Sequence, residues 1–242
     1  MQKYRGKIYE KYIKRILDII LSLIGIIVFS PVMLLIAILV KKKLGSPVIF
    51  KQPRPGKNEK IFYMYKFRSM TDKKDKDGKL LPDKIRVTEF GKKLRESSLD
   101  ELPELINILK GDMSIVGPRP QLVKDMVFMT LEQRKRHKVR QGLTGLAQIN
   151  GRNSISWEEK LEYDLEYVEN ITFLRDLKII IRTIFKVLKK DGITTYGMET
   201  AEDYGEYLLR KGFIDNIVYG LGLKEEKEII NGLKKEKMYF NK

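Results

Sequence analysis

An apolar segment from Ile16 to Val40 carries basic residues on both flanks, and this pattern limits the folds open to the chain more than any other feature. A helix of this length reaches about 37 Å, more than the roughly 30 Å of hydrocarbon in a bilayer. Spanning helices carry an excess of Lys and Arg on their cytoplasmic side only. Both ends of this segment therefore favour the cytoplasmic side, which a straight span does not allow.

The pair Ser30-Pro31 near the middle of the segment predicts a break. Proline lacks a backbone N–H, clashes with the carbonyl four residues earlier and disfavours helical geometry at the residue before it. The Ser30 hydroxyl is expected to bond a carbonyl that the break frees. We predict that residues 1–45 form a re-entrant helix–break–helix with Ser30 and Pro31 at the break. A kinked spanning helix and a buried helix of a soluble protein are the alternatives.

The net charge of +16 favours anionic partners. Beside a lipid-facing segment these are first of all anionic membrane lipids, at about 1 kcal/mol for each well-placed Lys or Arg. Anionic small substrates come second, and no nucleic acid is expected because its recognition motifs are missing. The single histidine, His137, lies in the basic run 134–138, which we expect to be solvated or to face lipid headgroups.

The absence of cysteine excludes disulfides, thiolate nucleophiles and Cys-ligated zinc. One histidine likewise excludes a multi-histidine metal site. Any metal must be held by carboxylates and substrate oxygens, which suits Mg²⁺.

The rest of the sequence predicts an α+β fold that is mostly helical. Short strands at 48–50 and 61–67, with turn residues at 53–56, indicate a β-hairpin. Helices are expected at 88–96, 103–110, 121–136, 156–168 and 176–190. The last is amphipathic and is either a core helix with a solvated face or an interfacial helix on the membrane surface. Beyond residue 195 one or two short helices are expected.

An adjacent carboxylate pair, Asp100 and Glu101, stands at the start of one predicted helix. Alone, such a pair is explained by its interaction with the helix dipole, at about 0.3–1 kcal/mol. Three arginines on constrained segments change that interpretation. Arg95 precedes the pair, Arg119 lies between two prolines, and Arg152 lies in a loop beside a glycine.

Guanidinium groups match the geometry of phosphate oxygens, so Arg95, Arg119 and Arg152 predict a phosphate or diphosphate clamp. One carboxylate of the pair can hold Mg²⁺ against a diphosphate, and the other can attack phosphorus. Arginine and metal are needed because a diphosphate repels an unshielded carboxylate.

Eight stretches from this part of the chain and the apolar segment occur in a characteristic order. They are Lys14–Asp18, Phe29–Pro31, Gln52–Gly56, Tyr65–Met70, Arg95–Pro103, Gly111–Pro120, Gly142–Gln148 and Asn150–Asn153. On these residues the chain resembles the bacterial sugar transferase family, the monotopic polyprenyl-phosphate phosphoglycosyl transferases, and most closely its small PglC-like members. The resemblance covers roughly residues 11–195.

The resemblance implies a reaction in two steps at the bacterial cytoplasmic membrane, with the catalytic domain on the cytoplasmic face. Asp100 is implied as the nucleophile that attacks a UDP-sugar and releases UMP. Polyprenyl (undecaprenyl) phosphate then takes the sugar phosphate, which begins lipid-linked glycan synthesis. Glu101 is implied in Mg²⁺ binding, and Arg95, Arg119 and Arg152 in phosphate and nucleotide binding.

The resemblance also divides the chain into the membrane element 1–45, a catalytic domain 46–195 and a C-terminal extension 196–242 of unknown role. The small members end near residue 195, and a homo-oligomer through the extension is left open. Two other functions compete with the two-step transferase. One is direct attack by polyprenyl phosphate with Asp100 as a metal ligand only, and the other is a basic membrane scaffold that recruits acidic partners.

Overall fold

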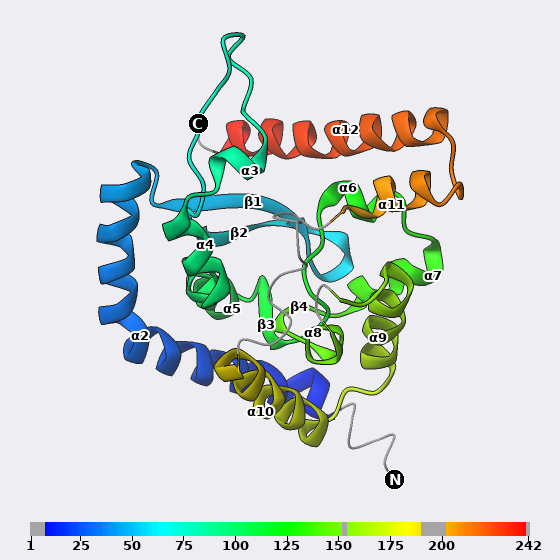
Figure 1. Ribbon diagram of the computed structural model, residues 1–242. Coiled ribbons are helices and arrows are strands. Elements are labelled where there is room, and N and C mark those ends of the chain that lie inside the picture. Colours follow the sequence, from blue (N-terminus) through cyan, green and yellow to red (C-terminus); the bar gives the residue numbers. More distant parts are fainter. Residues whose placement is uncertain (1–7, 152–153, 190–201, 241–242) are drawn as a thin grey trace.

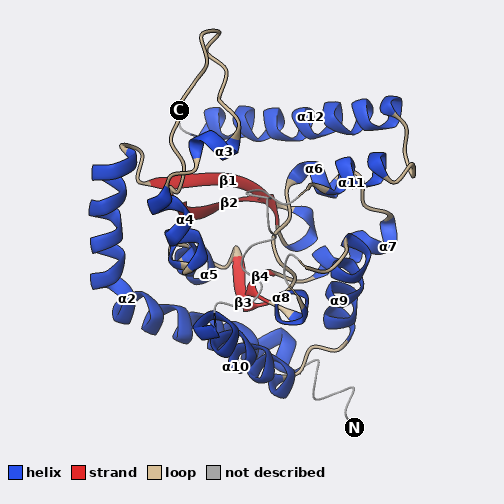
Figure 2. Ribbon diagram, viewed as in Figure 1, coloured by secondary structure: helices blue, strands red, loops and turns tan. Residues whose placement is uncertain are grey.

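The computed structural model describes residues 8–151, 154–189 and 202–240. Helices predominate, and the described residues hold two small sheets of two strands each (Figures 1 and 2). This arrangement confirms the predicted α+β class with mostly helical content. Residue Arg152 lies outside the described residues, and so does the junction predicted near residue 195.

The apolar segment forms helix α2 (Lys14–Leu44), which continues from the π-helical turn η1 (Tyr9–Ile13). The helix is uninterrupted through Ser30 and Pro31, so the predicted loss of helical geometry at Ser30 is wrong. Ile27 lies four residues before Pro31, so its carbonyl lacks the usual backbone donor. The Ser30 hydroxyl donates to that carbonyl at 2.8 Å, which confirms its predicted use and explains why the helix continues.

Helix α2 nevertheless changes direction near its middle, so its two halves lie along two sides of the globular part (Figure 1). A proline inside a helix is a common cause of such a bend, and Pro31 lies near the middle of α2. The helix from Tyr9 to Leu44 is long and apolar enough to cross a membrane, and only 11% of its most apolar stretch is buried. The core helix of a soluble protein would be mostly buried, so this exposure indicates a membrane protein. The re-entrant path stays a prediction.

Strands β1 (Ile49–Pro55) and β2 (Ile61–Phe67) form the predicted antiparallel hairpin, with Ile49 opposite Phe67. The turn, however, is made by Gly56, the 3-10 helix η2 (Lys57–Glu59) and Lys60, so the predicted turn stretch 53–56 is right only for Gly56. Pro53 and Pro55 lie within β1 instead. An edge strand tolerates proline because it does not need every backbone donor.

A second, parallel pair consists of β3 (Met113–Val116) and β4 (Gln141–Thr144). Helix α5 (Glu104–Lys110) connects the hairpin to this pair and packs against α2. The buried Asn107 side chain on α5 donates to the Tyr63 carbonyl at 2.8 Å and accepts from the Tyr65 N–H at 3.0 Å. It thereby satisfies the open edge of β2 and fixes the hairpin to α5.

The helix predicted at 121–136 is wrong, because this region forms three short pieces. Thr130 starts a new turn by accepting a hydrogen bond from the Gln133 N–H at 3.2 Å, which separates the pieces. Arg136 and His137 are fully buried, so the predicted solvated or headgroup-facing run is also wrong at these positions. The pieces are α6 (Val123–Met126), α7 (Leu131–Arg134) and the 3-10 helix η4 (Lys135–Lys138).

The helices predicted at 88–96, 156–168 and 176–190 match the structure closely, whereas the two short helices at 83–86 and 146–150 were not predicted. Ser156 and Glu159 form the predicted capping box. Between β2 and α5 lie α3 (Asp83–Arg86) and α4 (Glu89–Glu96), and after β4 come α8 (Leu146–Asn150), α9 (Trp157–Glu169) and α10 (Phe173–Lys189).

Helix α10 exposes one apolar face while Asp176 and Ile179 point into the protein. It runs beside the first half of α2 (Figure 1). A core helix with a solvated face would bury its apolar side, so the exposure favours the interfacial alternative. The exposed apolar residues of α10 are Phe173, Leu174, Leu177, Ile181, Ile184 and Phe185.

The described part of the C-terminal extension forms α11 (Tyr204–Arg210) and α12 (Asn216–Phe240). With 25 residues, α12 is much longer than the short helices predicted. The extension packs on the globular part, since the Tyr204 N–H donates to Asp125 Oδ1 at 2.9 Å and Tyr219 stacks on Phe128. The predicted domain boundaries stay a prediction.

Gly91 offers a test of how closely α4 packs. A Cβ at this helical glycine would lie 1.8 Å from the Ser69 carbonyl oxygen, whereas one at Gly220 in α12 would meet nothing within 4 Å. We expect Gly91→Ala to destabilise the protein by about 1–3 kcal/mol or more. Gly220→Ala is expected to be neutral or to stabilise by about 0.5–1 kcal/mol. Unfolding in detergent measures both variants, and equal stability of the two would contradict this packing.

Candidate active site

The predicted carboxylate pair lies in the 3-10 turn η3 (Leu99–Glu101), immediately before α5. Ser98 precedes the turn with a left-handed φ of 55°, so the chain reverses sharply after α4. Asp100 is 7% exposed. The Glu101 Oε1 atom accepts hydrogen bonds from Arg119 Nη2 at 2.6 Å and from Lys66 Nζ at 2.7 Å. Glu101 thus joins the hairpin, the start of α5 and the loop after β3.

Lys66 and Glu104 belong to the same cluster, although sequence reasoning gave them no role. Lys66 Nζ lies 3.2 Å from Oε1 of the buried Glu104 as well as contacting Glu101. Two signals in the sequence could have found them. Lys66 is a lone charge in the apolar strand β2, and Glu104 follows Asp100 at helical spacing, on one face with it.

The structure places Arg95 and Arg119 near the pair, as the clamp requires. Arg95 Nε donates to Ser69 Oγ at 2.9 Å, and the charges of both arginines act on Asp100. The Arg119 side chain is 38% exposed, so part of its guanidinium remains accessible to a ligand. Arg152, the third predicted member, lies outside the described residues.

A further arginine, Arg54, lies in the same region and was also missed. Its Nη1 donates to the Pro120 carbonyl at 3.1 Å and its Nη2 to Gln52 Oε1 at 2.7 Å. Its buried Nε atom has no hydrogen-bond partner among the described residues. Burial lowers the pKa of Arg54 to about 10, so it keeps its positive charge at neutral pH.

The loop that carries Arg119 is held by close backbone packing. The Gly117 N–H donates to the Thr144 carbonyl at 2.9 Å, and the Gly142 N–H donates to the Pro118 carbonyl at 2.8 Å. A Cβ on Gly117 would lie 2.4 Å from the Arg140 carbonyl oxygen. Only glycine permits the loop after β3 and the start of β4 to approach this closely. The Gly/Pro pattern therefore fixes the position of the loop that carries Arg119.

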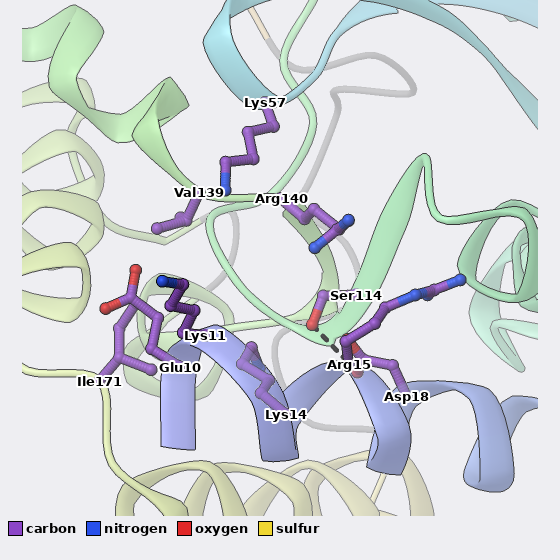
Figure 3. Close-up of a pocket in the computed structure, with 10 residues that line it drawn as sticks. All are labelled: Glu10, Lys11, Lys14, Arg15, Asp18, Lys57, Ser114, Val139, Arg140 and Ile171. Atoms are coloured by element: carbon purple, nitrogen blue, oxygen red, sulfur yellow. Dashed lines mark hydrogen bonds between the residues drawn. The ribbon is translucent and has the colours of Figure 1, made fainter. Parts of the chain in front are cut away.

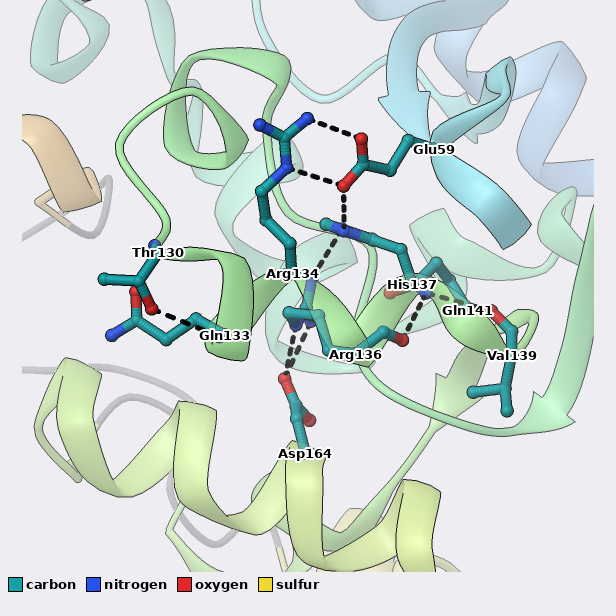
Figure 4. A network of polar contacts seen from close by, with 9 residues as sticks. All are labelled: Glu59, Thr130, Gln133, Arg134, Arg136, His137, Val139, Gln141 and Asp164. Carbon is teal, nitrogen blue, oxygen red and sulfur yellow. Dashed lines mark hydrogen bonds and ion pairs between the residues drawn. The ribbon is translucent and has the colours of Figure 1, made fainter.

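Figure 4 shows a buried polar network around Arg136, which also holds the backbone of Arg119. The Arg136 guanidinium donates to the Arg119 carbonyl at 2.6 Å and to Asp164 Oδ2 at 2.7 and 2.9 Å. Burial and the neighbouring Arg136 lower the pKa of His137 to about 2. His137 is therefore neutral, and its 3.6 Å approach to Glu59 is not an ion pair at neutral pH.

The three carboxylates have different proton affinities. Burial and the charge of Glu101 raise the pKa of Asp100 to about 6, while Lys66, Arg95 and Arg119 limit the rise. Burial raises the pKa of Glu104 to about 7. Burial alone would also raise the pKa of Glu101, but Arg119 and Lys66 lower it below the ordinary value. At neutral pH, Glu101 is therefore the carboxylate most firmly kept ionised, and Asp100 is largely ionised.

A magnesium ion fits this donor set only if substrate supplies most of its oxygens. Among residues 8–151, 154–189 and 202–240, no three His, Cys, Asp or Glu side chains converge as a metal cage. Magnesium commonly takes one or two carboxylates plus substrate phosphates and water. Asp100 and Glu101 can provide carboxylate oxygens, since the hydrogen bonds of Glu101 to Lys66 and Arg119 both fall on Oε1.

A buried aspartate next to a half-buried glutamate, arginines beside them and a long exposed apolar helix describe a membrane protein with a charged cluster in its globular part. The sequence matches the family described as bacterial sugar transferase over residues 9–190. It is 48% identical over 192 residues to the uncharacterized sugar transferase EpsL of Bacillus subtilis, covering 79% of this chain and 95% of that protein. The chain belongs to the bacterial sugar transferase family.

Relatives with named activities match over a smaller share of their length. One is the UDP-glucose:undecaprenyl-phosphate glucose-1-phosphate transferase of Klebsiella pneumoniae, 46% identical over 72% of this chain and 39% of that protein. Another is the undecaprenyl-phosphate galactose phosphotransferase of Salmonella typhimurium, 35% identical over 79% of this chain and 44% of that protein. The chain thus spans less than half the length of these two enzymes.

The raised pKa of Asp100 can be measured by the NMR titration of ¹³C-labelled aspartate side chains. The resonance that disappears in Asp100→Asn is expected to titrate near pH 6, because burial and Glu101 favour the protonated form. Removing a nearby positive charge by Arg95→Gln is expected to raise the pKa further. A titration near the ordinary aspartate pKa, unchanged by Arg95→Gln, would contradict the electrostatics described for this site.

Proposed function

We propose that this protein transfers a sugar 1-phosphate from a UDP-sugar to polyprenyl (undecaprenyl) phosphate, with release of UMP, through an aspartyl-phosphosugar intermediate. The observation that carries the proposal is the position of Asp100. It is a buried carboxylate beside Glu101, which is itself held by Arg119 and Lys66. The named relatives supply the donor and acceptor class, because their names contain UDP-glucose and undecaprenyl phosphate.

In the first step, a carboxylate oxygen of Asp100 attacks the β-phosphorus of the UDP-sugar. A bond forms between this oxygen and phosphorus, and the bond from phosphorus to the bridging oxygen breaks. The bridging oxygen leaves with UMP, and the sugar phosphate stays on Asp100 as a mixed anhydride. With a pKa of about 6, Asp100 is mostly ionised at neutral pH and has the electron pair that the attack requires.

In the second step, a phosphate oxygen of polyprenyl phosphate attacks the same phosphorus. The bond between phosphorus and the Asp100 oxygen breaks, which restores the carboxylate and gives a polyprenyl-diphosphate sugar. The nucleophile is regenerated without a net proton change on the protein. The order of events is ping-pong, because UMP leaves before the lipid acceptor reacts.

The cationic residues make these steps feasible by offsetting negative charge. A carboxylate and a diphosphate repel each other, and fixed positive charges reduce that repulsion in the transition state. Arg119 is both paired with Glu101 and partly exposed, so it can bind phosphate oxygens through its remaining donors. Arg95, Arg54 and Arg152 are proposed to bind the remaining phosphate and nucleotide oxygens.

Magnesium is proposed as the cofactor, with Glu101 as its protein ligand beside Asp100. When bound, the ion would neutralise charge on the diphosphate. The pairing of Glu101 with Lys66 and Arg119 keeps its carboxylate ionised and oriented. Nearby Glu104, with a pKa of about 7, is poorly suited to the same role because it is partly protonated at neutral pH.

The membrane elements are proposed to bring the lipid acceptor to the site. Exposed apolar residues lie on α2 and on α10, and we propose that together they form a lipid-facing surface. We propose that α2 is re-entrant, that α10 lies at the membrane surface, and that the globular part lies on the cytoplasmic face of the bacterial inner membrane. Basic residues on both flanks of α2 support this orientation, since positive charge favours the cytoplasmic side.

The covalent step is tested by UMP release in the absence of lipid acceptor. A panel of UDP-glucose, UDP-galactose and UDP-N-acetylgalactosamine follows the sugars in the relatives' names. With its sugar, the protein should release about one UMP per molecule and gain the mass of the sugar phosphate. Asp100→Asn should release none and gain no mass.

Asp100→Asn has nearly the same shape as the parent protein at this position. Unfolding of the two proteins, measured in parallel, therefore controls for a folding defect. Substantial turnover by Asp100→Asn would remove the nucleophile from the proposal. Turnover by the parent protein without burst or mass gain would favour direct attack by polyprenyl phosphate. Binding of acidic proteins without any UMP release would favour the scaffold instead.

The topology of α2 can be tested because the chain has no cysteine. Tyr12→Cys and Lys42→Cys place single thiols at opposite ends of the helix, at exposed positions. In membrane vesicles of known orientation, an impermeant maleimide should label both from the cytoplasmic side. Adding Pro31→Ala is expected to move Tyr12→Cys to the other side, because it removes the cause of the bend. Labelling of the two positions from opposite sides in the parent background would establish a span.

A further inference from the structure

A cavity of about 370 Å³ lies beside the first turns of the membrane helix, away from the carboxylate pair (Figure 3). Its lining comes from η1 and the start of α2, the hairpin turn η2, the start of β3 and the chain before β4. Arg140 in this lining donates from Nε to the carbonyl of Gly111, at the C-terminal end of α5, with a distance of 2.8 Å. Asp100 and Glu101 precede the other end of α5, so this is a second site.

Three basic side chains enter the cavity from three different segments. Figure 3 shows Lys57 extending from the hairpin turn, the Arg140 guanidinium directed inward and the Lys11 ammonium rising from the helix. None of the three forms an ion pair with another described residue. The Lys11 Nζ atom lies 5.2 Å from the centroid of the Tyr12 ring. Arg140 donates its hydrogen bond to Gly111 from Nε, which leaves both terminal nitrogens of the guanidinium available to a ligand.

The other charged groups of the lining already have partners within the fold. Lys14 Nζ pairs with Asp176 at 2.5 Å, and Arg15 donates to the carbonyls of Ile108 and Leu109 at 2.6 and 2.9 Å. Asp18 accepts from Ser114 Oγ at 3.0 Å and from a backbone N–H. Of the lining carboxylates, only Glu10 at the exposed rim is left to offset Lys11, Lys57 and Arg140. The lining therefore carries five basic side chains against the two carboxylates Glu10 and Asp18, so the cavity has a net positive charge.

The position of the cavity selects the kind of anion that reaches it. Along the start of α2, Lys11, Lys14, Arg15 and Asp18 form a polar stripe on the side that lines the cavity. Ile16, Ile19 and Ile20 of the same turns are exposed and apolar. Helix α10, with its exposed apolar face, runs along this half of α2. An anion whose tail lies against these apolar residues would have its head at the level of the cavity.

We propose that this cavity is a binding site for the phosphate group of an anionic membrane lipid, held by Lys11, Lys57 and Arg140. The location at a bilayer rests on the proposed membrane-bound function, whereas the chemistry of the cavity does not depend on catalysis. Arg140 supplies a guanidinium fork for two phosphate oxygens, and the lysines add point charges. The occupied site would join η1, η2 and the start of β4 and thereby seat the globular part on the membrane.

The test measures lipid binding to the full chain in nanodiscs. The discs contain phosphatidylcholine with a small share of spin-labelled phosphatidic acid, and quenching of a fluorophore on a single cysteine that replaces the exposed rim residue Glu10 in every protein compared reports occupancy. The Lys11→Gln/Lys57→Gln variant removes two charges at exposed positions, where folding is not at risk. We expect association at least about tenfold weaker, because each lysine would lose a direct charge-assisted hydrogen bond to the lipid phosphate.

A matched control separates a site from general attraction to the membrane. Lys41→Gln/Lys42→Gln removes two exposed lysines from the other flank of α2, outside the cavity. This variant should keep the parent affinity within about twofold, since its charges act only through the screened surface potential. Equal loss in the two double variants, or no quenching in the parent protein, would overturn the proposal.

Inorganic phosphate distinguishes the lipid from a soluble source of the same group. In discs of phosphatidylcholine alone, titration with inorganic phosphate should leave the fluorophore unchanged, and it should not displace phosphatidic acid. Saturable binding of inorganic phosphate that Lys11→Gln/Lys57→Gln weakens would assign the site to a soluble phosphate instead, and overturn the lipid assignment. UMP release by the parent protein tests the proposed function separately, so the two proposals can fail independently.

Discussion

The Glu101 carboxylate joins three segments that lie far apart in the sequence, and the site depends on this contact. Its Oε1 atom accepts from Lys66 on the hairpin and from Arg119 in the loop after β3. Removing either cation would leave a buried negative charge beside Asp100, at a cost of several kcal/mol typical of broken buried pairs. The same two cations hold the pKa of Glu101 down and limit the rise at Asp100. Position and charge of the proposed nucleophile therefore have one common origin.

Buried residues that take no part in the chemistry hold the two cations of this contact in position. Asn107 fixes β2 and with it Lys66, while the Arg136–Asp164 pair holds the backbone of Arg119. Both groups are buried and hydrogen-bonded, so they restrict movement of the cations they position. Close backbone contacts at Gly117 and Gly142 complete the support, because any side chain there would displace the loop.

In the membrane helix α2, one side-chain hydrogen bond replaces the backbone hydrogen bond that proline removes, and the helix continues where the sequence predicted a break. Pro31 removes a donor from the Ile27 carbonyl, and the Ser30 hydroxyl replaces it. The helix therefore bends without ending, and the apolar segment becomes two connected halves around the globular part. The polar stripe at its start lines the cationic cavity and pairs with α5 and α10, so this helix is part of the fold as well as an anchor.

The sequence by itself determined the apolar segment, the hairpin, the capped helices and the pairing of Asp100-Glu101 with nearby arginines. These depend on periodicity, caps and local spacing, which act over a few residues. It did not predict the burial of Arg136 and His137, the three pieces at 121–136, or the roles of Lys66, Glu104 and Arg54. Those were decided by tertiary structure, because a charge can be buried only where segments distant in sequence bring its partner. The bend at Pro31 is a different case, because the Ser30 hydrogen bond to the Ile27 carbonyl is local and was predicted, whereas the continuation of the helix through Ser30 was not.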